Sequence, residues 1–300
     1  MVQGPRRMMR TILAAMLLLC TAFAVGEVHA QSSGPSTEPT AEDIARGKAL
    51  THAGDCAGCH TADPARPFAG GKRIDTAFGG VYSLNLTPDR ETGLGAWTDN
   101  EFYLALRFGV ARDGSRYYPA FPYPHFTRLT RQDILAIRAY LATLTPVKNA
   151  PRAPELRWPF NYRAVMRGWN WLFFKPGILM PDQKKSAEWN RGRYLVEGVA
   201  HCGTCHTPKN ILGADKRGQK YGGGQVAGVS APRLDGAEGS GLTSWSVEDI
   251  VEYLQSGRNA KSRAGEMMSE VVANSTSRMS DADVRAIAVY LKDLPAGGRS

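Results

Sequence analysis

Two pentapeptides of one pattern hold the residues of this chain that are best suited to chemistry. They are Cys56-Ala57-Gly58-Cys59-His60 and Cys202-Gly203-Thr204-Cys205-His206. Both read C-x-x-C-H, the attachment signature of a c-type haem. Two thiols at this spacing can each add to a vinyl group of one porphyrin, and the histidine that follows is then held against the iron as proximal ligand. The motifs predict two covalently bound haem c groups, attached through Cys56, Cys59, Cys202 and Cys205 and ligated by His60 and His206.

Other reactions of cysteine fit the sequence less well. A zinc site would need further cysteines or paired histidines at metal-ligand spacing, and none follow the motifs. A thioredoxin-like redox site would need a βαβ pattern and would leave both histidines unexplained. The one cysteine outside the two motifs, Cys20, lies in a segment that is expected to be a targeting signal. The mature chain therefore has no further thiol for a disulfide or a nucleophile.

The elements around the two motifs repeat, which indicates a tandem duplication. The offset between matching residues grows only from 145 to 150, as small loop insertions would cause. The matching positions are Arg46-Gly47 with Arg191-Gly192, Cys56 with Cys202, Trp97 with Trp245, and Tyr140-Leu141 with Tyr290-Leu291.

Each half shows the same three helix signals. A short helix is predicted after Thr40 and after Ser186, ending just before the motif. A second helix is opened by Thr98 and by Ser246 and covers residues 102–108 and 250–256, each followed by a glycine that can end it. The last helices begin at Thr130 and Ser280, carry apolar residues at helical spacing and stop before a proline. The intervening loops show no sustained alternation of polarity, so little sheet is expected.

This order of elements resembles a class I cytochrome c domain in each half. The resemblance implies an all-α fold of two tandem class I cytochrome c domains with long haem-wrapping loops. It also implies that the first and last helices cross with glycine against an aromatic ring, which Gly47 with Tyr140 and Gly192 with Tyr290 match. The whole chain resembles the cytochrome c subunits of periplasmic alcohol, aldehyde and molybdenum-hydroxylase-type dehydrogenases, through residues 69–71, 84–89, 92–97 and 117–123.

The resemblance also suggests the sixth iron ligands. In the second half it selects Met268, two residues before Glu270, with Met267 as the close competitor. In the first half, many relatives read Pro-Ala-Met-Pro where this chain has Pro119-Ala120-Phe121-Pro122. We therefore hypothesise that His125, the only histidine in the right region, ligates the first haem and lowers its potential relative to a methionine-ligated second haem. The alternative is a five-coordinate first haem behind Phe121, with His125 on the surface.

The remaining residues near the motifs receive lesser roles. His52 and His201 are interpreted as hydrogen-bonding or surface residues rather than iron ligands. By the resemblance, Pro88 and Pro232 are expected near the proximal imidazoles, where such contacts orient a ligand.

The N-terminus has the pattern of a secretory signal peptide over residues 1–30. A basic region with three arginines precedes an apolar run at 12–25, and cleavage is expected after Ala30. This predicts a periplasmic protein. Residues 31–39 are expected to be disordered, followed by a first domain at 40–148, a linker at 149–186 and a second domain at 187–295.

The linker combines five prolines with six tryptophan and phenylalanine side chains. A flexible exposed tether with so many rings would be a liability. The favoured interpretation is that the rings pack against both domains, and the alternative is that residues 169–174 form a docking patch for a dehydrogenase or a membrane surface.

The charge and motifs together favour electron transfer. The formal net charge is +9, or +7 without residues 1–30, which suits an acidic docking partner. Basic residues are scattered, which disfavours nucleic acid. We expect a subunit that is not an enzyme by itself and passes electrons from a periplasmic dehydrogenase to another cytochrome or a terminal oxidase, with peripheral membrane association through a partner. A dihaem enzyme of peroxidase or thiosulfate dehydrogenase type is the main alternative, and a haem-based sensor is the third.

Overall fold

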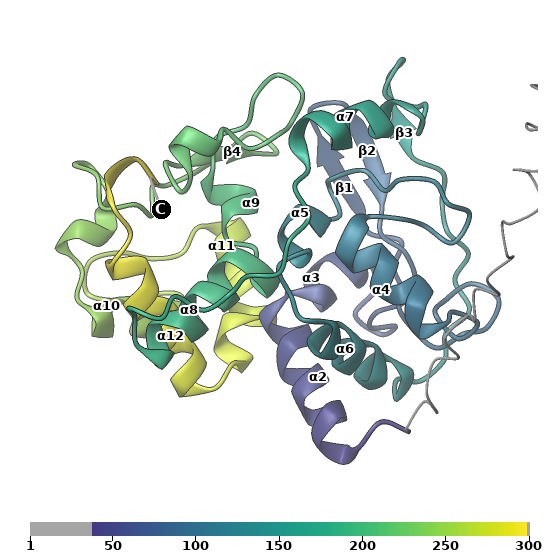
Figure 1. Ribbon diagram of the computed structural model, residues 1–300, viewed down its shortest axis with the longest axis horizontal. Coiled ribbons are helices and arrows are strands. Elements are labelled where there is room, and N and C mark those ends of the chain that lie inside the picture. The colour runs from purple at the N-terminus through teal and green to yellow at the C-terminus, as the bar shows by residue number, and fades with distance from the viewer. Residues whose placement is uncertain (1–37, 299–300) are drawn as a thin grey trace, which may run out of the picture. The chain divides into compact units, whose positions relative to one another are not determined.

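The computed structural model describes residues 38–298, and Figure 1 shows their arrangement. The predicted signal peptide and nearly all of the segment expected to be disordered lie outside the described residues. The first half contains α2 (Ala41–Ala53), α3 (Cys56–His60), β1 (Arg73–Thr76), β2 (Gly79–Tyr82), α4 (Asp99–Phe108), α5 (Tyr123–Phe126) and α6 (Arg131–Ala142).

The linker and the second half follow the same order. The linker contributes β3 (Glu155–Leu156) and α7 (Val165–Phe173). The second half contains α8 (Ala187–Tyr194), a π-helical turn η1 (Leu195–Val199), α9 (Gly203–His206), β4 (Gly224–Val226), β5 (Val229–Ala231), α10 (Val247–Ser256), α11 (Glu266–Asn274) and α12 (Asp281–Lys292). Among the described residues no helix has both the length and the apolar character needed to cross a membrane.

The predicted helix starts are confirmed at the level of single hydrogen bonds. In each of the six helices predicted from the sequence, the side chain of a serine or threonine N-cap accepts from the backbone N–H three residues later, which satisfies an otherwise unpaired donor. These caps are Thr40, Thr98, Thr130, Ser186, Ser246 and Ser280. The glycines at positions 109 and 257 end α4 and α10 in the left-handed conformation, as expected.

The first and last helices of each half cross at the predicted glycines. A Cβ atom at Gly192 would lie 2.5 Å from the carbonyl carbon of Ala286 and 2.9 Å from the Cβ of Tyr290. A Cβ at Gly47 would collide with the carbonyl group of Ala136 in the same way. Only glycine lets these backbones approach so closely.

The same crossing carries a repeated ion pair. Arg46 Nε lies 2.5 Å from an oxygen of Asp133, and Arg191 binds Asp283 with two hydrogen bonds of 2.7 and 2.9 Å. Each arginine precedes the crossing glycine, so the duplicated Arg-Gly pair fixes both the distance and the rotation of the two helices.

The expectation of an all-α fold is correct for the core but incomplete for the loops. β1 and β2 form an antiparallel hairpin that β3 extends, and β4 pairs with β5 at the corresponding place in the second half. These strands are two to four residues long. So few residues cannot show a convincing period of two, which is why the loops gave no strand signal.

The two halves contact each other through matching elements, and the described residues from Pro39 onward form one compact unit. α5 packs against η1 of the second half, and α11 packs against α3 of the first. Glu197 is the polar centre of this interface. It is only 2 % exposed, lies 2.8 Å from Lys220 Nζ and 3.4 Å from Arg128 Nη1, and accepts a hydrogen bond from the Tyr290 hydroxyl.

Some aromatic side chains of the linker pack against the two domains, and others are exposed. Phe160 packs on Phe78, Phe174 packs on Tyr123, and Trp169 donates a hydrogen bond of 2.9 Å to the carbonyl of Leu212. Trp158 and Trp171 are nevertheless 77 % and 84 % exposed. The prediction that the rings pack against both domains is therefore correct for part of the linker and wrong for these two tryptophans.

Candidate functional site

The first C-x-x-C-H motif is itself the short helix α3. Because residues three and four apart share one helix face, Cys56, Cys59 and His60 are presented together. Asp55, which precedes the motif, has a left-handed backbone with φ 48°. It turns the chain sharply from α2 into α3 and so sets the direction of the motif.

Each motif histidine is held in a single tautomer by a backbone carbonyl. His60 Nδ1 lies 2.6 Å from the oxygen of Leu84, and His206 Nδ1 lies 2.8 Å from the oxygen of Pro232. With Nδ1 donating, Nε2 keeps its lone pair for a metal. Burial lowers the pKa of both histidines, which keeps that lone pair unprotonated. Pro232 was therefore placed correctly, whereas Leu84 takes the role expected of Pro88.

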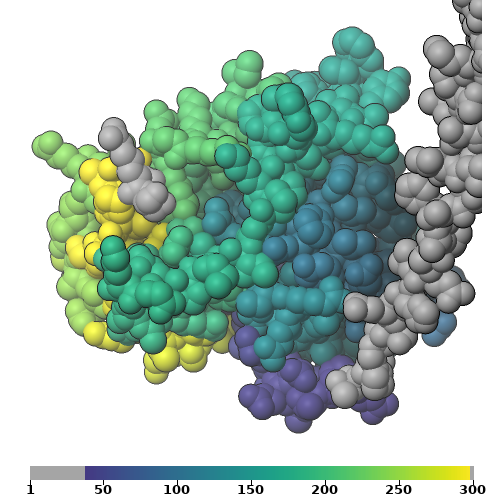
Figure 2. All heavy atoms as spheres, in the orientation of Figure 1, coloured from purple at the N-terminus to yellow at the C-terminus, as the bar shows by residue number. Residues whose placement is uncertain are grey.

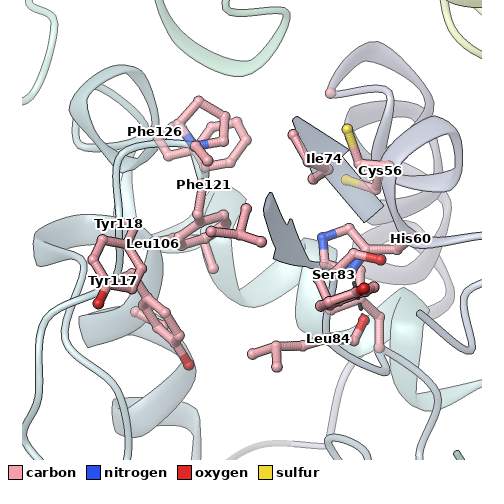
Figure 3. Close-up of a pocket in the computed structure, with 18 of the residues that line it drawn as sticks. Cys56, His60, Ile74, Ser83, Leu84, Leu106, Tyr117, Tyr118, Phe121 and Phe126 are labelled. Carbon is pink, nitrogen blue, oxygen red and sulfur yellow. Dashed lines mark hydrogen bonds between the residues drawn. The ribbon is translucent and has the colours of Figure 1, made fainter. Parts of the chain in front are cut away.

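Next to the first motif lies a large and mostly apolar cavity. The space within it, including the part open to solvent, is about 1350 Å³. In Figure 3 the cysteine and histidine of the motif lie on one side, and Leu106, Tyr117 and Phe121 face them from the other. The linker contributes Arg152 and Arg163 to the lining.

The donor set and the cavity fit a covalently attached haem. The apolar walls suit a porphyrin, and burial raises the pKa of Cys56 to about 12 and that of Cys59 to about 11. Among residues 38–298 no group of three or more Cys, His, Asp or Glu side chains is placed to hold a metal ion.

Met268 follows the second motif in the sequence, in the region where a distal ligand is expected. Met268 lies on α11 and packs against the same hydrophobic cluster as Cys202 and Trp245. Met267 is half-buried but is not part of that cluster. Because that cluster also takes in Cys56 and Phe121 of the first half, the choice of Met268 over Met267 at the second haem stays a prediction.

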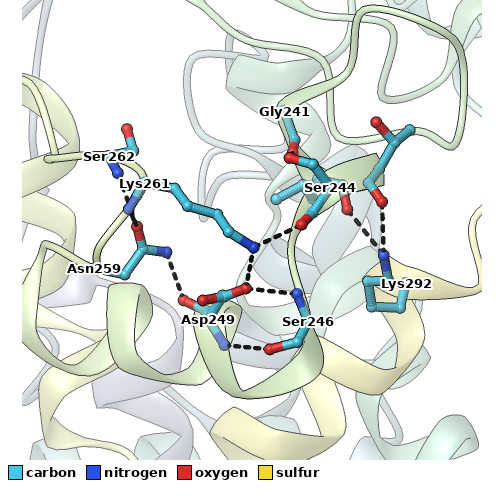
Figure 4. Close-up of polar contacts among 10 residues, drawn as sticks. Gly241, Ser244, Ser246, Asp249, Asn259, Lys261, Ser262 and Lys292 are labelled. Atoms are coloured by element: carbon cyan, nitrogen blue, oxygen red, sulfur yellow. Dashed lines mark hydrogen bonds and ion pairs between the residues drawn. The ribbon is translucent and has the colours of Figure 1, made fainter.

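The loop that leads into α11 is tied down by lysine and asparagine side chains (Figure 4). Lys261 Nζ lies 2.6 Å from both the Ser244 carbonyl oxygen and a carboxylate oxygen of Asp249, and Asn259 donates to the Asp249 carbonyl at 2.8 Å. These bonds hold the start of α11 against α10.

The structure does not bring His125 to the first site. His125 is buried, with Nδ1 3.3 Å from the carbonyl oxygen of Glu197 and Nε2 3.7 Å from a carboxylate oxygen of Asp215. Both partners belong to the second half, and His125 is not among the residues that line the cavity. The hypothesis that His125 ligates the first haem is corrected on this geometry: the ring points into the interface between the halves.

The duplication explains this position. At the offset of 150 residues, His125 corresponds to Ser275, whose hydroxyl donates to the carbonyl of Ala53 at 3.2 Å. In each half, therefore, one polar side chain contacts the end of the first helix of the other half. In the first half this side chain is on α5, and in the second half it directly follows α11. Comparing the two halves position by position could have revealed this interface role.

Sequence reasoning did not predict that His201 lies at the first cavity. It lines the first cavity, and its ring centroid lies 5.6 Å from that of Phe126. Burial lowers its pKa to about 4, so it is neutral at physiological pH. At the offset of 146 residues it corresponds to Asp55, and both residues have positive φ directly before a motif. The shared position of His201 and Asp55 directly before a motif was the sequence signal that could have drawn attention to His201.

One carboxyl, that of Asp55, affects a thiol in each motif. Burial raises the pKa of Cys59 and of Cys205, and in both cases the carboxyl of Asp55 raises it further. Burial also raises the pKa of Asp55 itself to about 7.

Comparison with known proteins agrees with this arrangement. The Cytochrome c family model matches residues 44–145 and 190–295. The chain is 42 % identical over 283 residues to a nicotinate dehydrogenase subunit of Pseudomonas putida, covering 94 % of this chain and 24 % of that protein. It is 37 % identical over 300 residues to the fructose dehydrogenase cytochrome subunit of Gluconobacter japonicus, covering 98 % and 61 %.

A further relative matches over most of both chains. The protein named "Diheme cytochrome c-type" of Cereibacter sphaeroides is 40 % identical over 267 residues, which cover 85 % of this chain and 86 % of that protein. The chain thus spans less than two thirds of the first two relatives but most of this one.

Proposed function

The chain belongs to the cytochrome c family, and from this premise we propose that it is a dihaem electron-transfer subunit of a dehydrogenase. The observation that carries the proposal is the repeated motif in which each histidine has Nδ1 bonded to a backbone carbonyl and Nε2 left for iron. The relatives named as dehydrogenase cytochrome subunits support a dehydrogenase as electron donor. The acceptor is a downstream cytochrome or terminal oxidase.

In this proposal, haem bound at the four motif cysteines supplies reversible one-electron chemistry. The chain supplies the iron ligands, sets the reduction potential and provides the surface on which partners dock. His60 and His206 are the proximal ligands, and Met268 is the distal ligand at the second site. Arg152 and Arg163 line the first cavity beside the linker, where guanidinium groups can pair with the haem carboxylates. The expected location is the periplasm, in keeping with the predicted signal peptide.

Contacts between the halves beside the first motif support direct transfer between the haems. α11 of the second half packs against α3, the helix of the first motif. Electrons that enter at one haem then reach the other within the same chain.

The exposed part of the linker is proposed as the docking surface for the dehydrogenase. Residues 156–181 contain four basic and no acidic residues, and Trp158, Trp171 and Leu172 are exposed among them. Figure 2 shows the chain with the linker residues in teal on this face. Tryptophan and arginine are the side chains that dominate protein interfaces, and a basic rim selects an acidic partner. The same linker lines the first cavity, so docking here brings the donor close to the first haem.

Two measurements test the proposal. The protein, produced in a periplasm with haem attachment, should give two haems per chain by alkaline pyridine haemochrome, and Cys59→Ser and Cys205→Ser should each weaken attachment at one site. Purification from the native periplasm should recover a dehydrogenase that reduces the protein when its substrate is added. A chain that carries no covalent haem, or that turns over peroxide or thiosulfate without any dehydrogenase, would contradict the proposal.

A further inference from the structure

We propose that the cavity beside His60 binds a small neutral diatomic gas at the haem iron, because Phe121, which has no donor atom, lies in the wall that faces His60. The inference rests on the proposed attachment of haem to Cys56 and Cys59, and it goes beyond electron transfer because it assigns this haem a ligand of its own. Carbon monoxide is the probe for the site.

The wall that faces His60 is built from Leu106, Phe121, Tyr117 and Tyr118, as Figure 3 shows. Leucine and phenylalanine have no donor atom. Burial raises the pKa of Tyr117 to about 12 and also raises that of Tyr118. Both remain neutral phenols at physiological pH, and a phenol is a far weaker iron ligand than a phenolate.

Phe121 is fixed in this wall rather than free to swing aside. Its backbone N–H donates to the Tyr118 carbonyl at 3.0 Å, and its own carbonyl accepts from Tyr123 N–H at 2.8 Å. Its ring contacts those of Tyr117 and Phe126 at centroid distances of 5.4 and 5.5 Å, both edge to face. It occupies the position at which the resemblance places a ligating methionine.

The two neighbouring histidines have other partners. His125 faces Glu197 and Asp215 in the second half. His201 lines the cavity, and its ring packs on that of Phe126 at 5.6 Å between centroids.

The cavity favours a neutral ligand. Its lining is mostly apolar, and an anion that enters such a site loses hydration without regaining hydrogen bonds. The guanidinium of Arg163, the nearest fixed charge to the tyrosines of the wall, lies over both of their rings and donates to the carbonyl of Arg116 at 3.1 Å. A neutral diatomic gas does not need hydrogen-bond donors from the cavity wall.

The test uses the purified protein with both haems attached. Haem is counted by pyridine haemochrome, and the dithionite-reduced protein is titrated with carbon monoxide while absorption and resonance Raman spectra are recorded. The expected result is one carbon monoxide bound per two haems, with a high-spin five-coordinate component in its absence. Two haems that are both low-spin, with no carbon monoxide bound, would overturn this inference and leave the dihaem proposal intact, whereas fewer than two haems would contradict the dihaem proposal itself.

Two variants of one residue sharpen the result. Phe121→Met places a thioether in the wall and should abolish the high-spin component and weaken carbon monoxide binding at least tenfold. Phe121→Leu keeps a similar size without a donor atom and should leave both signals in place. His125→Ala and His201→Ala should also leave the spin state of the reduced protein unchanged. Conversion of a low-spin haem to high-spin by either histidine variant would identify that histidine as the sixth ligand and overturn the inference.

Discussion

Replacing Gly192 by alanine should destabilise the second half, although alanine is the better helix former. A Cβ at this position would lie 2.5 Å from the carbonyl carbon of Ala286. Since ordinary contacts begin near 3.4 Å, α8 and α12 would have to separate by about 1 Å. The obstacle is backbone, which cannot rotate away as a flexible side chain can.

The magnitude follows from two opposing effects. Overpacking of this kind costs about 3 kcal/mol at the upper end of its usual range, and the helix propensity of alanine returns about 1 kcal/mol. The net loss of about 2 kcal/mol corresponds to a fall in Tm of about 4–8 °C for a protein of this size. Thermal unfolding followed by far-UV circular dichroism measures it.

A matched control lies in the linker. Gly168 is in α7, and a Cβ built on it meets nothing within 4 Å. Gly168→Ala should therefore leave Tm unchanged or raise it slightly. If Gly192→Ala behaved like Gly168→Ala, the close crossing of the two helices would be refuted.

Three other perturbations address the two sites and the docking surface. Met268→Ala should lower the potential of the second haem and make it high-spin, whereas Met267→Ala should change neither in a spectroelectrochemical titration; the reverse pattern would exchange their roles. Asp55, whose pKa burial raises to about 7 from an ordinary value of 3.8, favours the folded state most below pH 4, and this contribution is lost as the pH rises through 7. Asp55→Asn should therefore flatten the pH dependence of stability between pH 4 and 8 in urea titrations, and an unchanged slope would show that the carboxyl is not buried. Trp171→Ser should weaken binding to the partner dehydrogenase at least tenfold in surface plasmon resonance with no change in Tm, and equal binding would exclude this surface.

The features that the sequence predicted well are those set by local chemistry or by the duplication. Thr98 and Ser246 cap their helices because a hydroxyl before an acidic first turn satisfies the free N–H groups. Gly47 and Gly192 mark the helix crossings because only glycine permits that approach. Both are readable from a few consecutive residues and their repeat.

The features that could not be predicted from the sequence depend on the direction in which a side chain points. His125 follows Phe121 by only four residues, so chain distance suggested the same cavity. The short helix α5 instead turns its ring toward Glu197 and Asp215 of the other half. His201 was set aside because it adjoins a motif of the second half, yet packing between the halves places it at the first cavity. Contacts between domains leave no trace in local spacing.

The measurement that tests the account most directly is a spectroelectrochemical titration of the purified protein with its haem content determined in the same sample. The account predicts two reversible one-electron components per chain, with the higher potential at the site that has Met268, because a thioether ligand raises the potential of iron. A single one-electron component per chain, or two components that Met268→Ala leaves unchanged, would contradict it.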